Sequence, residues 1–152
     1  MTIFNGLNTS ASALTTKRLR MDVISANIAN ADSTRTRFVD GQWEPYRRKM
    51  VVTSPNEAPS FASQLQRAIG RSNSTVGNGV KVDRIVEDQT PFKQVYNPDH
   101  PDADENGFIQ LPNVDPLREM VDLMTTTRSY EANVTAINGT KNMLLKALEI
   151  GR

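Results

Sequence analysis

The chain has 152 residues, with 18 lysine and arginine residues against 17 acidic residues, 38% hydrophobic residues and a mean hydropathy of −0.49. This composition predicts about one soluble domain with too little apolar material for a large core, and the balanced charge gives no electrostatic case for nucleic acid. The absence of cysteine excludes a disulfide framework and a thiolate metal site. Because no apolar run is long enough to span a membrane and the N-terminus has no signal-peptide pattern, we expect a cytosolic protein or one exported by another route.

The N-terminal segment, residues 1–31, has the pattern of an amphipathic helix. Apolar residues recur at every seventh position. A second row contains Ile24 and Ala31 but is interrupted by Ser10 and Lys17, so this seam is weaker than the C-terminal one. Such a seam predicts that the helix packs along a partner helix. The seam residues expected at this interface are Leu7, Leu14, Met21, Ile24 and Ile28.

Residues 32–112 have a different pattern and predict a small β-rich module. All eight prolines lie between Pro45 and Pro116, where they would interrupt a helix. Runs of β-branched and aromatic residues between turn formers predict four strands, with a loop insertion near residues 54–78. The expected strands cover Trp43–Thr53, Gly79–Glu87, Phe92–Tyr96 and Phe108–Leu111.

The first expected strand follows a polar crossing that runs through Arg37. Its alternation places Tyr46, Met50 and Val52 on one face of the strand. Inside the loop insertion, Ser60 is a suitable cap for a short helix.

Residues 113–152 predict the second long helix. With Met120 as the first position of a heptad, seven of nine seam positions are apolar or aromatic. Thr127 and Lys141 occupy the other two positions, where they set the register or else mark a slip of the heptad frame. The seam residues expected at the interface are Met120, Leu123, Tyr130, Val134, Ile137, Leu144 and Leu148.

The predicted fold is therefore α+β and helix-dominated, with the terminal helices paired as an antiparallel coiled coil and the β-rich module between them. At about 1.5 Å per residue the two helices would extend roughly 40 and 50 Å, whereas a compact chain of this size has a radius of gyration of about 15 Å. Helices of this length project from a single globule, and a projecting apolar stripe needs a partner. Self-assembly, or assembly with similar chains, would supply one.

One acidic segment has part of a calcium-binding pattern. Asp102, Asp104 and Asn106 fit the first three ligand positions of an EF-hand loop, and Gly107 fits its turn. The closing glutamate is replaced by Asn113, and prolines block the flanking helices. The three residues form at most a weak calcium site. The alternative is an acidic loop that leads through Asn106-Gly107 into the next strand.

Other chemistry has little support in the sequence. The single histidine, His100, lies among prolines in a predicted loop, and no strand-turn-helix nucleophile elbow is visible. Lys17, Arg18 and Arg20 are too few for a basic DNA-binding helix. We therefore expect no enzyme activity, cofactor, small-molecule substrate or nucleic acid partner.

Charge is unevenly spread along the middle of the chain. Residues 35–71 carry seven basic residues against three acidic ones, whereas residues 83–115 carry eight acidic residues against two basic ones. One interpretation is head-to-tail contact between neighbouring copies. The other is two solvated faces of one small module.

Several segments resemble the rod and hook family of bacterial flagellar axial proteins. The stretch Ser25-Ala26-Asn27-Ile28-Ala29-Asn30-Ala31 resembles the signature that closes the first helix in that family. The stretches Arg118–Met124 and Arg128–Asn133 and the ending Lys146–Arg152 are similar to the family's C-terminal helix. Together with central segments such as Pro45–Lys49, the resemblance covers essentially the whole chain.

The resemblance implies a structural role in the proximal rod of the flagellar basal body. Family members stack helically into a tube that transmits torque from motor to hook and conducts exported subunits, and they are needed for swimming. They are exported unfolded by the flagellar type III apparatus without a cleaved signal peptide. The implied partners are other rod subunits, copies of the chain itself and the export apparatus, without membrane insertion.

Two further expectations follow. Isolated helices are marginally stable in water, so we expect both termini to be largely disordered in the free monomer and to fold on assembly. Asn138-Gly139 stands where the family usually has alanines, and glycine in a helix costs about 1 kcal/mol relative to alanine. Gly139 therefore either softens the helix or marks a close helix contact. The alternative function is a coiled-coil adaptor that binds one partner without polymerising.

Overall fold

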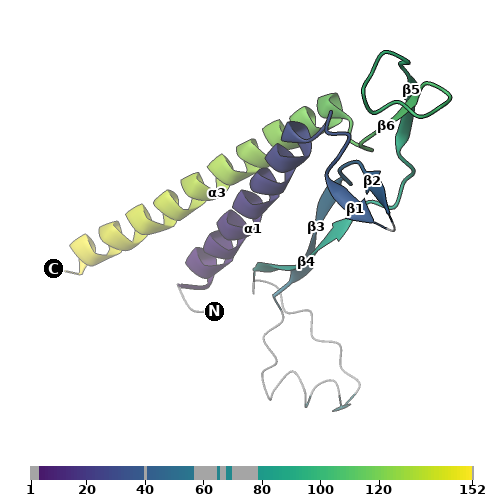
Figure 1. Ribbon diagram of the computed structural model, residues 1–152. Helices are drawn as coiled ribbons and strands as arrows, with labels where there is room; N and C mark the ends of the chain where they lie inside the picture. Colours follow the sequence, from purple (N-terminus) through teal and green to yellow (C-terminus); the bar gives the residue numbers. More distant parts are fainter. Residues whose placement is uncertain (1–3, 40, 57–64, 66–67, 70–78, 152) are drawn as a thin grey trace. The chain divides into compact units, whose positions relative to one another are not determined.

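The computed structural model describes residues 4–39, 41–56, 65, 68–69 and 79–151 (Figure 1). No helix among these residues is both long enough and apolar enough to cross a membrane. The elements, in chain order, are α1 (Phe4–Ala29), β1 (Arg37–Val39), β2 (Gln42–Glu44), β3 (Lys49–Pro55), β4 (Val80–Glu87), β5 (Lys93–Tyr96), β6 (Phe108–Leu111) and α3 (Pro116–Ile150).

The predicted fold class, a helix-dominated α+β protein, is confirmed. Two long helices pack against each other, and the described strands between them form three antiparallel pairs, β1 with β2, β3 with β4 and β5 with β6. The helix ends also agree with the sequence. α1 ends at Ala29, next to the expected end at Asn30, and α3 begins at Pro116, one residue before the proline-free run.

The chain divides into two compact units, and both helices contribute to each. The first unit comprises Met1–Arg18, Thr53–Asp83 and Arg128–Arg152, and the second comprises Leu19–Val52 and Arg84–Thr127. Each unit therefore contains part of α1, part of α3 and part of the β3–β4 pair.

In the first unit, the start of β4 lies directly against α1. The Val80 N–H donates to Ser12 Oγ at 3.1 Å, and this hydroxyl donates to the Thr9 carbonyl at 2.7 Å. Gly79 has a φ of +79°, and a Cβ at this position would overlap Ser12 Oγ. Glycine is required here because the backbone is left-handed and the approach to α1 is close.

Gly79→Ala is therefore expected to lower the free energy of unfolding by about 1–3 kcal/mol. Gly139→Ala is the matched control, because Gly139 lies inside α3 and, apart from its own stretch of the helix, no atom of the described residues lies within 4 Å of the added Cβ. The control should raise the free energy of unfolding by about 1 kcal/mol. Urea denaturation followed by circular dichroism measures both variants, and an equal change in the two would contradict the proposed role of Gly79.

The second unit contains the β1–β2 hairpin, which the sequence analysis missed. Phe38 pairs with Trp43 and Val39 pairs with Gln42, so that only Asp40-Gly41 lies between the strands in sequence. Gly41 has a φ of +85°, as a tight hairpin turn requires. The expected polar crossing through Arg37 is wrong, although Asp-Gly between two short apolar runs is a strong hairpin signal.

The single strand expected over Trp43–Thr53 is also wrong, because the chain leaves the strand conformation at residues 45–48, between β2 and β3. The predicted alternation is still visible in β3, because Met50 and Val52 are half-buried whereas Lys49 and Thr53 are exposed. Val51, which the alternation places on the other face, departs from it and is buried.

The remaining strand predictions are confirmed within one residue at each end. β5 and β6 form a hairpin in which Tyr96 pairs with Phe108, and the long connection ends at Gly107, whose φ is +78°. The expected turn at Asn106-Gly107 is thus present. Only Leu65, Ala68 and Ile69 of the short helix predicted to begin at Ser60 are described. Leu65 and Ala68 are helical, and the Ile69 N–H donates to the Leu65 carbonyl at 3.0 Å.

The start of α3 has an N-terminal cap. Asp115 Oδ1 accepts the Leu117 N–H at 3.1 Å, and Pro116 occupies the first helical turn, where its missing N–H costs nothing. In the second unit, Asn27 of α1 bonds to Glu119 of α3, and Met21 contacts Thr127. Since the numbers fall along one helix as they rise along the other, the two helices are antiparallel in this unit.

Candidate functional site: a polar clamp between the helices

Asn27, near the end of α1, is the centre of a buried polar network in the second unit. It is 1% exposed. Its amide nitrogen donates to Glu119 Oε2 at 3.0 Å and to the Lys49 carbonyl at 2.9 Å. Its amide oxygen accepts from the Tyr46 hydroxyl at 3.0 Å and from the Lys49 N–H at 2.9 Å. Both donors and both acceptor sites are used, so this one side chain connects α1, α3 and β3.

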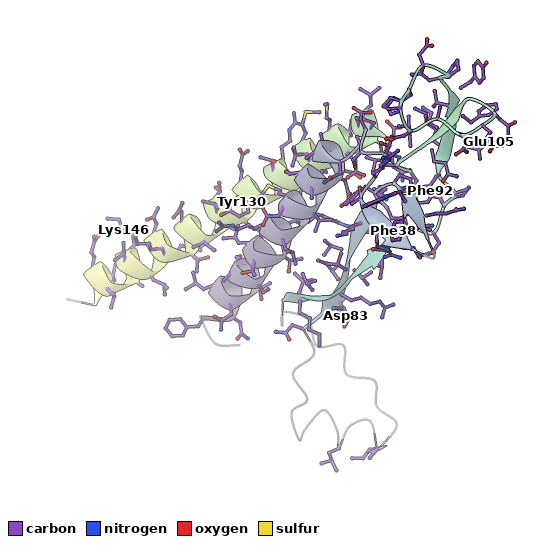
Figure 2. The ribbon with its side chains drawn as sticks, viewed as in Figure 1. Phe38, Asp83, Phe92, Glu105, Tyr130 and Lys146 are labelled. Atoms are coloured by element: carbon purple, nitrogen blue, oxygen red, sulfur yellow. The ribbon has the colours of Figure 1, made fainter. Side chains whose placement is uncertain are left out.

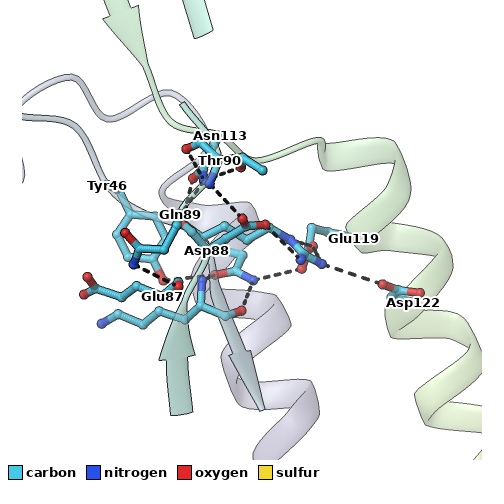
Figure 3. A network of polar contacts seen from close by, with 11 residues as sticks. Tyr46, Glu87, Asp88, Gln89, Thr90, Asn113, Glu119 and Asp122 are labelled. Carbon is cyan, nitrogen blue, oxygen red and sulfur yellow. Dashed lines mark hydrogen bonds and ion pairs between the residues drawn. The ribbon is translucent and has the colours of Figure 1, made fainter. Parts of the chain in front are cut away.

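Glu119 and Arg48 form the charged part of the network (Figure 3). The Glu119 side chain is fully buried, and its Oε1 accepts from Arg48 Nε at 2.7 Å and Nη2 at 2.6 Å. Arg48 also lies 3.6 Å from Asp88 Oδ2 and 4.0 Å from Asp122 Oδ2. A buried carboxylate is tolerated only when it is paired and hydrogen-bonded, and here both conditions hold.

Asn113 links the same network to the segment that follows β4. Its Oδ1 accepts the Arg48 N–H at 2.8 Å, and its amide nitrogen donates to Thr90 Oγ1 at 2.9 Å and to the carbonyls of Asp88 and Thr90. We call Asn27, Tyr46, Arg48, Asn113 and Glu119 the polar clamp.

Two pKa values in this region are shifted. The Thr90 N–H, which donates to Asp88 Oδ1 at 3.0 Å, lowers the pKa of Asp88, and Arg48 acts in the same direction. A lowered carboxyl pKa contributes stability above the unfolded-state pKa, and this stability is lost as the pH falls through the folded-state pKa. Burial, with Glu119 and Glu87 nearby, raises the pKa of Tyr46. Tyr46 therefore keeps the proton that it donates to Asn27.

The hydrogen-bonding groups of the clamp are occupied by one another and by neighbouring groups of Lys49, Asp88 and Thr90. Such a network does not present a nucleophile or a free acid–base pair to a substrate, but it fixes the helices to one another and to the strands. A satisfied buried network also specifies one arrangement over its alternatives. The chemistry of this site is therefore structural.

Comparison with known proteins identifies the family. Residues 7–35 match the family described as flagella basal body rod protein, and residues 105–150 match the flagellar basal body rod FlgEFG protein C-terminal family. The flagellar basal-body rod protein FlgC of Bacillus subtilis is 58% identical to the chain over the full length of both. The FlgC proteins of Escherichia coli O157:H7 and Borreliella burgdorferi are 41% and 40% identical and cover 98% or more of both chains.

The chain belongs to the FlgC family of flagellar basal-body rod proteins. It is therefore a structural subunit of the flagellar basal-body rod, not an enzyme, and assembles with other rod components. Asn27 lies within the first matched family segment and Glu119 within the second. The clamp thus joins the two segments that match the flagellar rod family models.

The FlgC-family seam predicted for α3 separates into two rows in this structure. Leu123, Tyr130, Ile137 and Leu144 are half-buried (Tyr130 is labelled in Figure 2). The other predicted seam residues of this helix are exposed, at 47% for Met120, 36% for Val134 and 71% for Leu148. On α1, Ile24 is buried, and the remaining predicted residues, Leu7, Leu14, Met21 and Ile28, are half-buried.

A second row of covered residues on α3 alternates with the row that contains Leu123. This second row begins at Glu119, whereas the sequence predicted that it begins one residue later, at Met120. This row is polar, and it consists of Glu119, Thr126, Asn133 and Thr140, the first two buried and the last two half-buried. In the row that starts at Met120, Met120, Val134 and Leu148 are therefore exposed within the chain, whereas Thr127 is half-buried and contacts Met21. Apolar periodicity could not predict the row that begins at Glu119, because all four of its residues are polar.

The three residues predicted as weak calcium ligands do not share one environment. Asp102 forms an ion pair with Arg35 and accepts from Thr34 Oγ1 at 2.6 Å, whereas Asp104 and Asn106 are exposed. Within the described part of the chain, no three His, Cys, Asp or Glu side chains are grouped to hold a metal ion. His100 Nδ1 accepts the Asp102 N–H at 3.1 Å, which is a contact within the loop.

Ion pairs connect the basic and acidic segments of the same chain. Arg35 pairs with Asp102, Arg48 with Asp88, and Arg37 lies 3.8 Å from Glu87. All of these contacts are within the second unit. They favour the interpretation of two faces of one module over head-to-tail contact between copies.

Proposed function

We propose that this FlgC-family chain polymerises through its terminal helices into the proximal rod, together with copies of itself and other rod subunits. The observation that supports this proposal is an apolar row on α3 that its own chain leaves exposed. In the second unit the row contains Leu117, Met120, Val121 and Met124, and all four side chains are roughly half exposed or more. In the first unit Val134, Leu145 and Leu148 recur at helical spacing.

An exposed apolar row of this kind is stabilised when another molecule covers it. Burying apolar surface contributes about 25 cal/mol per Å², and contiguous apolar patches on soluble chains mark interaction sites. A heterologous contact that does not close on itself produces a tube or filament. The exposed row therefore has the properties expected of a subunit of a helical assembly.

The seam predicted for α3 serves two contacts, one with the chain's own α1 and one with neighbouring subunits. Leu123, Tyr130, Ile137 and Leu144 pack toward the chain's own α1, and Met120, Val134 and Leu148 pack against neighbouring subunits. The five predicted seam residues of α1, from Leu7 to Ile28, form the other side of this contact within the chain. The polar clamp holds α1 and α3 in one direction and register, so that each copy presents the same exposed row.

The rest of the proposed role rests on family membership. The rod transmits torque from motor to hook and conducts exported subunits, so the chain is needed for swimming. The chain reaches the rod through the flagellar type III export apparatus. Its terminal helices become fully ordered on assembly, because isolated helices are marginal until tertiary contacts form.

Leu148→Asp tests the assembly role. The side chain is 71% exposed, so the substitution leaves the free monomer's stability within about 0.5 kcal/mol of the wild type. Co-sedimentation with the other rod subunits should be lost, and cells that depend on the variant should not swim. Lys146→Gln, two residues away and also exposed, is the control and should assemble normally. Normal co-sedimentation of Leu148→Asp would refute the proposal, and binding to one partner without polymer would indicate an adaptor instead.

A further inference from the structure

A polar groove lies in the second unit between the β1–β2 hairpin and the loop that joins β5 to β6. It has a volume of about 710 Å³ and is open to solvent on one side. This volume is within the range of about 300–1,000 Å³ typical of small-molecule sites. The polar clamp does not contribute to it, and neither does the exposed row of α3.

Two arginines in the groove are held in place by other side chains. The Arg47 guanidinium lies 4.3 Å from the centre of the Phe92 ring, and Arg35 forms an ion pair with Asp102 (Phe92 is labelled in Figure 2). Each guanidinium has five N–H donors, and these contacts use only part of them. The groove therefore offers donors in fixed positions, and fixed positions reduce the entropy cost of binding.

Trp43 supplies an aromatic surface in the same groove. Its side chain is 55% exposed, and its ring is steadied by Phe38 of the paired strand, with the ring centres 5.2 Å apart. An indole presents a flat apolar face and one N–H donor. Glu44 and Asp104 line the groove as well and add acceptors.

The lining selects one class of ligand. Two arginines stand against three carboxylates, those of Glu44, Asp102 and Asp104, so the groove does not favour a polyanion. β2 lines the groove and has a free edge, because its sheet contains only β1 and β2 among the described strands. Peptide grooves also need pockets for alternate side chains, and the lining here is mainly polar, which favours a ligand rich in hydroxyl groups over a peptide. A sugar ring has an apolar face that stacks on an aromatic ring and a rim of hydroxyl groups that donate and accept. We propose that this groove binds a neutral oligosaccharide, with one ring stacked on Trp43.

Trp43 is the only tryptophan in the chain, so its fluorescence reports on the groove directly. The full-length monomer is titrated separately with chitotetraose, with cellotetraose and with a proline-rich decapeptide. We expect a saturable change in emission with at least one of the two sugars and no change with the peptide.

Asp104→Ala should weaken sugar binding roughly tenfold, because it removes a charged hydrogen-bond acceptor from the groove. Glu105→Ala is the matched control, because this neighbouring carboxylate is exposed and does not line the groove, and its affinity should equal that of the wild type. The proposal would be overturned if neither sugar produced a saturable change up to about 10 mM, or if only the peptide produced one. Equal weakening of sugar binding in the two variants would also overturn it.

Discussion

Glu119→Ala should lower the free energy of unfolding by about 3–5 kcal/mol, which is a large part of the roughly 5–15 kcal/mol that typical domains possess. The substitution removes the acceptor for Arg48 Nε and Nη2 and for the Asn27 amide. These donors would remain in a space that solvent barely reaches. Arg48 would keep only its longer contacts with Asp88 and Asp122. Removing one partner of a buried ion pair costs much more than the intact pair stabilises.

Urea denaturation of the free chain, followed by circular dichroism, measures this loss. Glu131→Ala is the matched control, because Glu131 also lies on α3 but is exposed, and its effect should stay within about 0.5 kcal/mol. In a double-mutant cycle, Arg48→Met combined with Glu119→Ala should cost less than the sum of the single changes. Additive effects would mean that the ion pair is not the source of the loss.

Hydrophobic periodicity was sufficient to predict the architecture of this chain. Two long apolar repeats predicted both helices, and the positions of the prolines predicted that strands rather than helix lie between them. The failures were local. The chain breaks the strand expected over Trp43–Thr53 at the point where Tyr46 and Arg48 enter the clamp. Propensity alone does not predict this break, because tertiary hydrogen bonds determine it.

The polar clamp was not predicted from the sequence for a related reason. A search for apolar seams treats Asn27 and Glu119 as surface residues, and both are almost completely buried. Asn27 did appear in the sequence analysis, but only within a family signature and without a role. Buried polar groups become visible only when their partners, here far apart in sequence, are brought together.

A periodic pattern also does not say which molecule covers an apolar row. On α3 the seam predicted from the sequence combined a half-buried row with an exposed one, because both are apolar and differ by less than one helical turn. The structure of one chain separates them. The rows are expected to respond differently to the same substitution, since one packs within the chain and the other is free in the monomer.

Ile137→Asp and Met120→Asp test this difference. Ile137 is half-buried, so its substitution should lower the free energy of unfolding of the monomer by about 1.5–3 kcal/mol, the value of burying such a side chain. Met120 is 47% exposed, so its substitution should leave the monomer within about 0.5 kcal/mol of the wild type. Both variants should fail to form rods, Ile137→Asp because the helix pair is weakened and Met120→Asp because a charge is placed in the contact between subunits.

Denaturation of the free monomer and electron microscopy of rods assembled in cells that lack the wild-type chain separate the two mechanisms. Asn142→Asp adds the same charge at an exposed polar position of α3 and should change neither measurement. If Met120→Asp destabilises the monomer as much as Ile137→Asp, the exposed row belongs to the chain's own core. If Met120→Asp still builds rods, the contact between subunits lies on another face, because a buried, unpaired carboxylate at an apolar interface is too costly to accommodate.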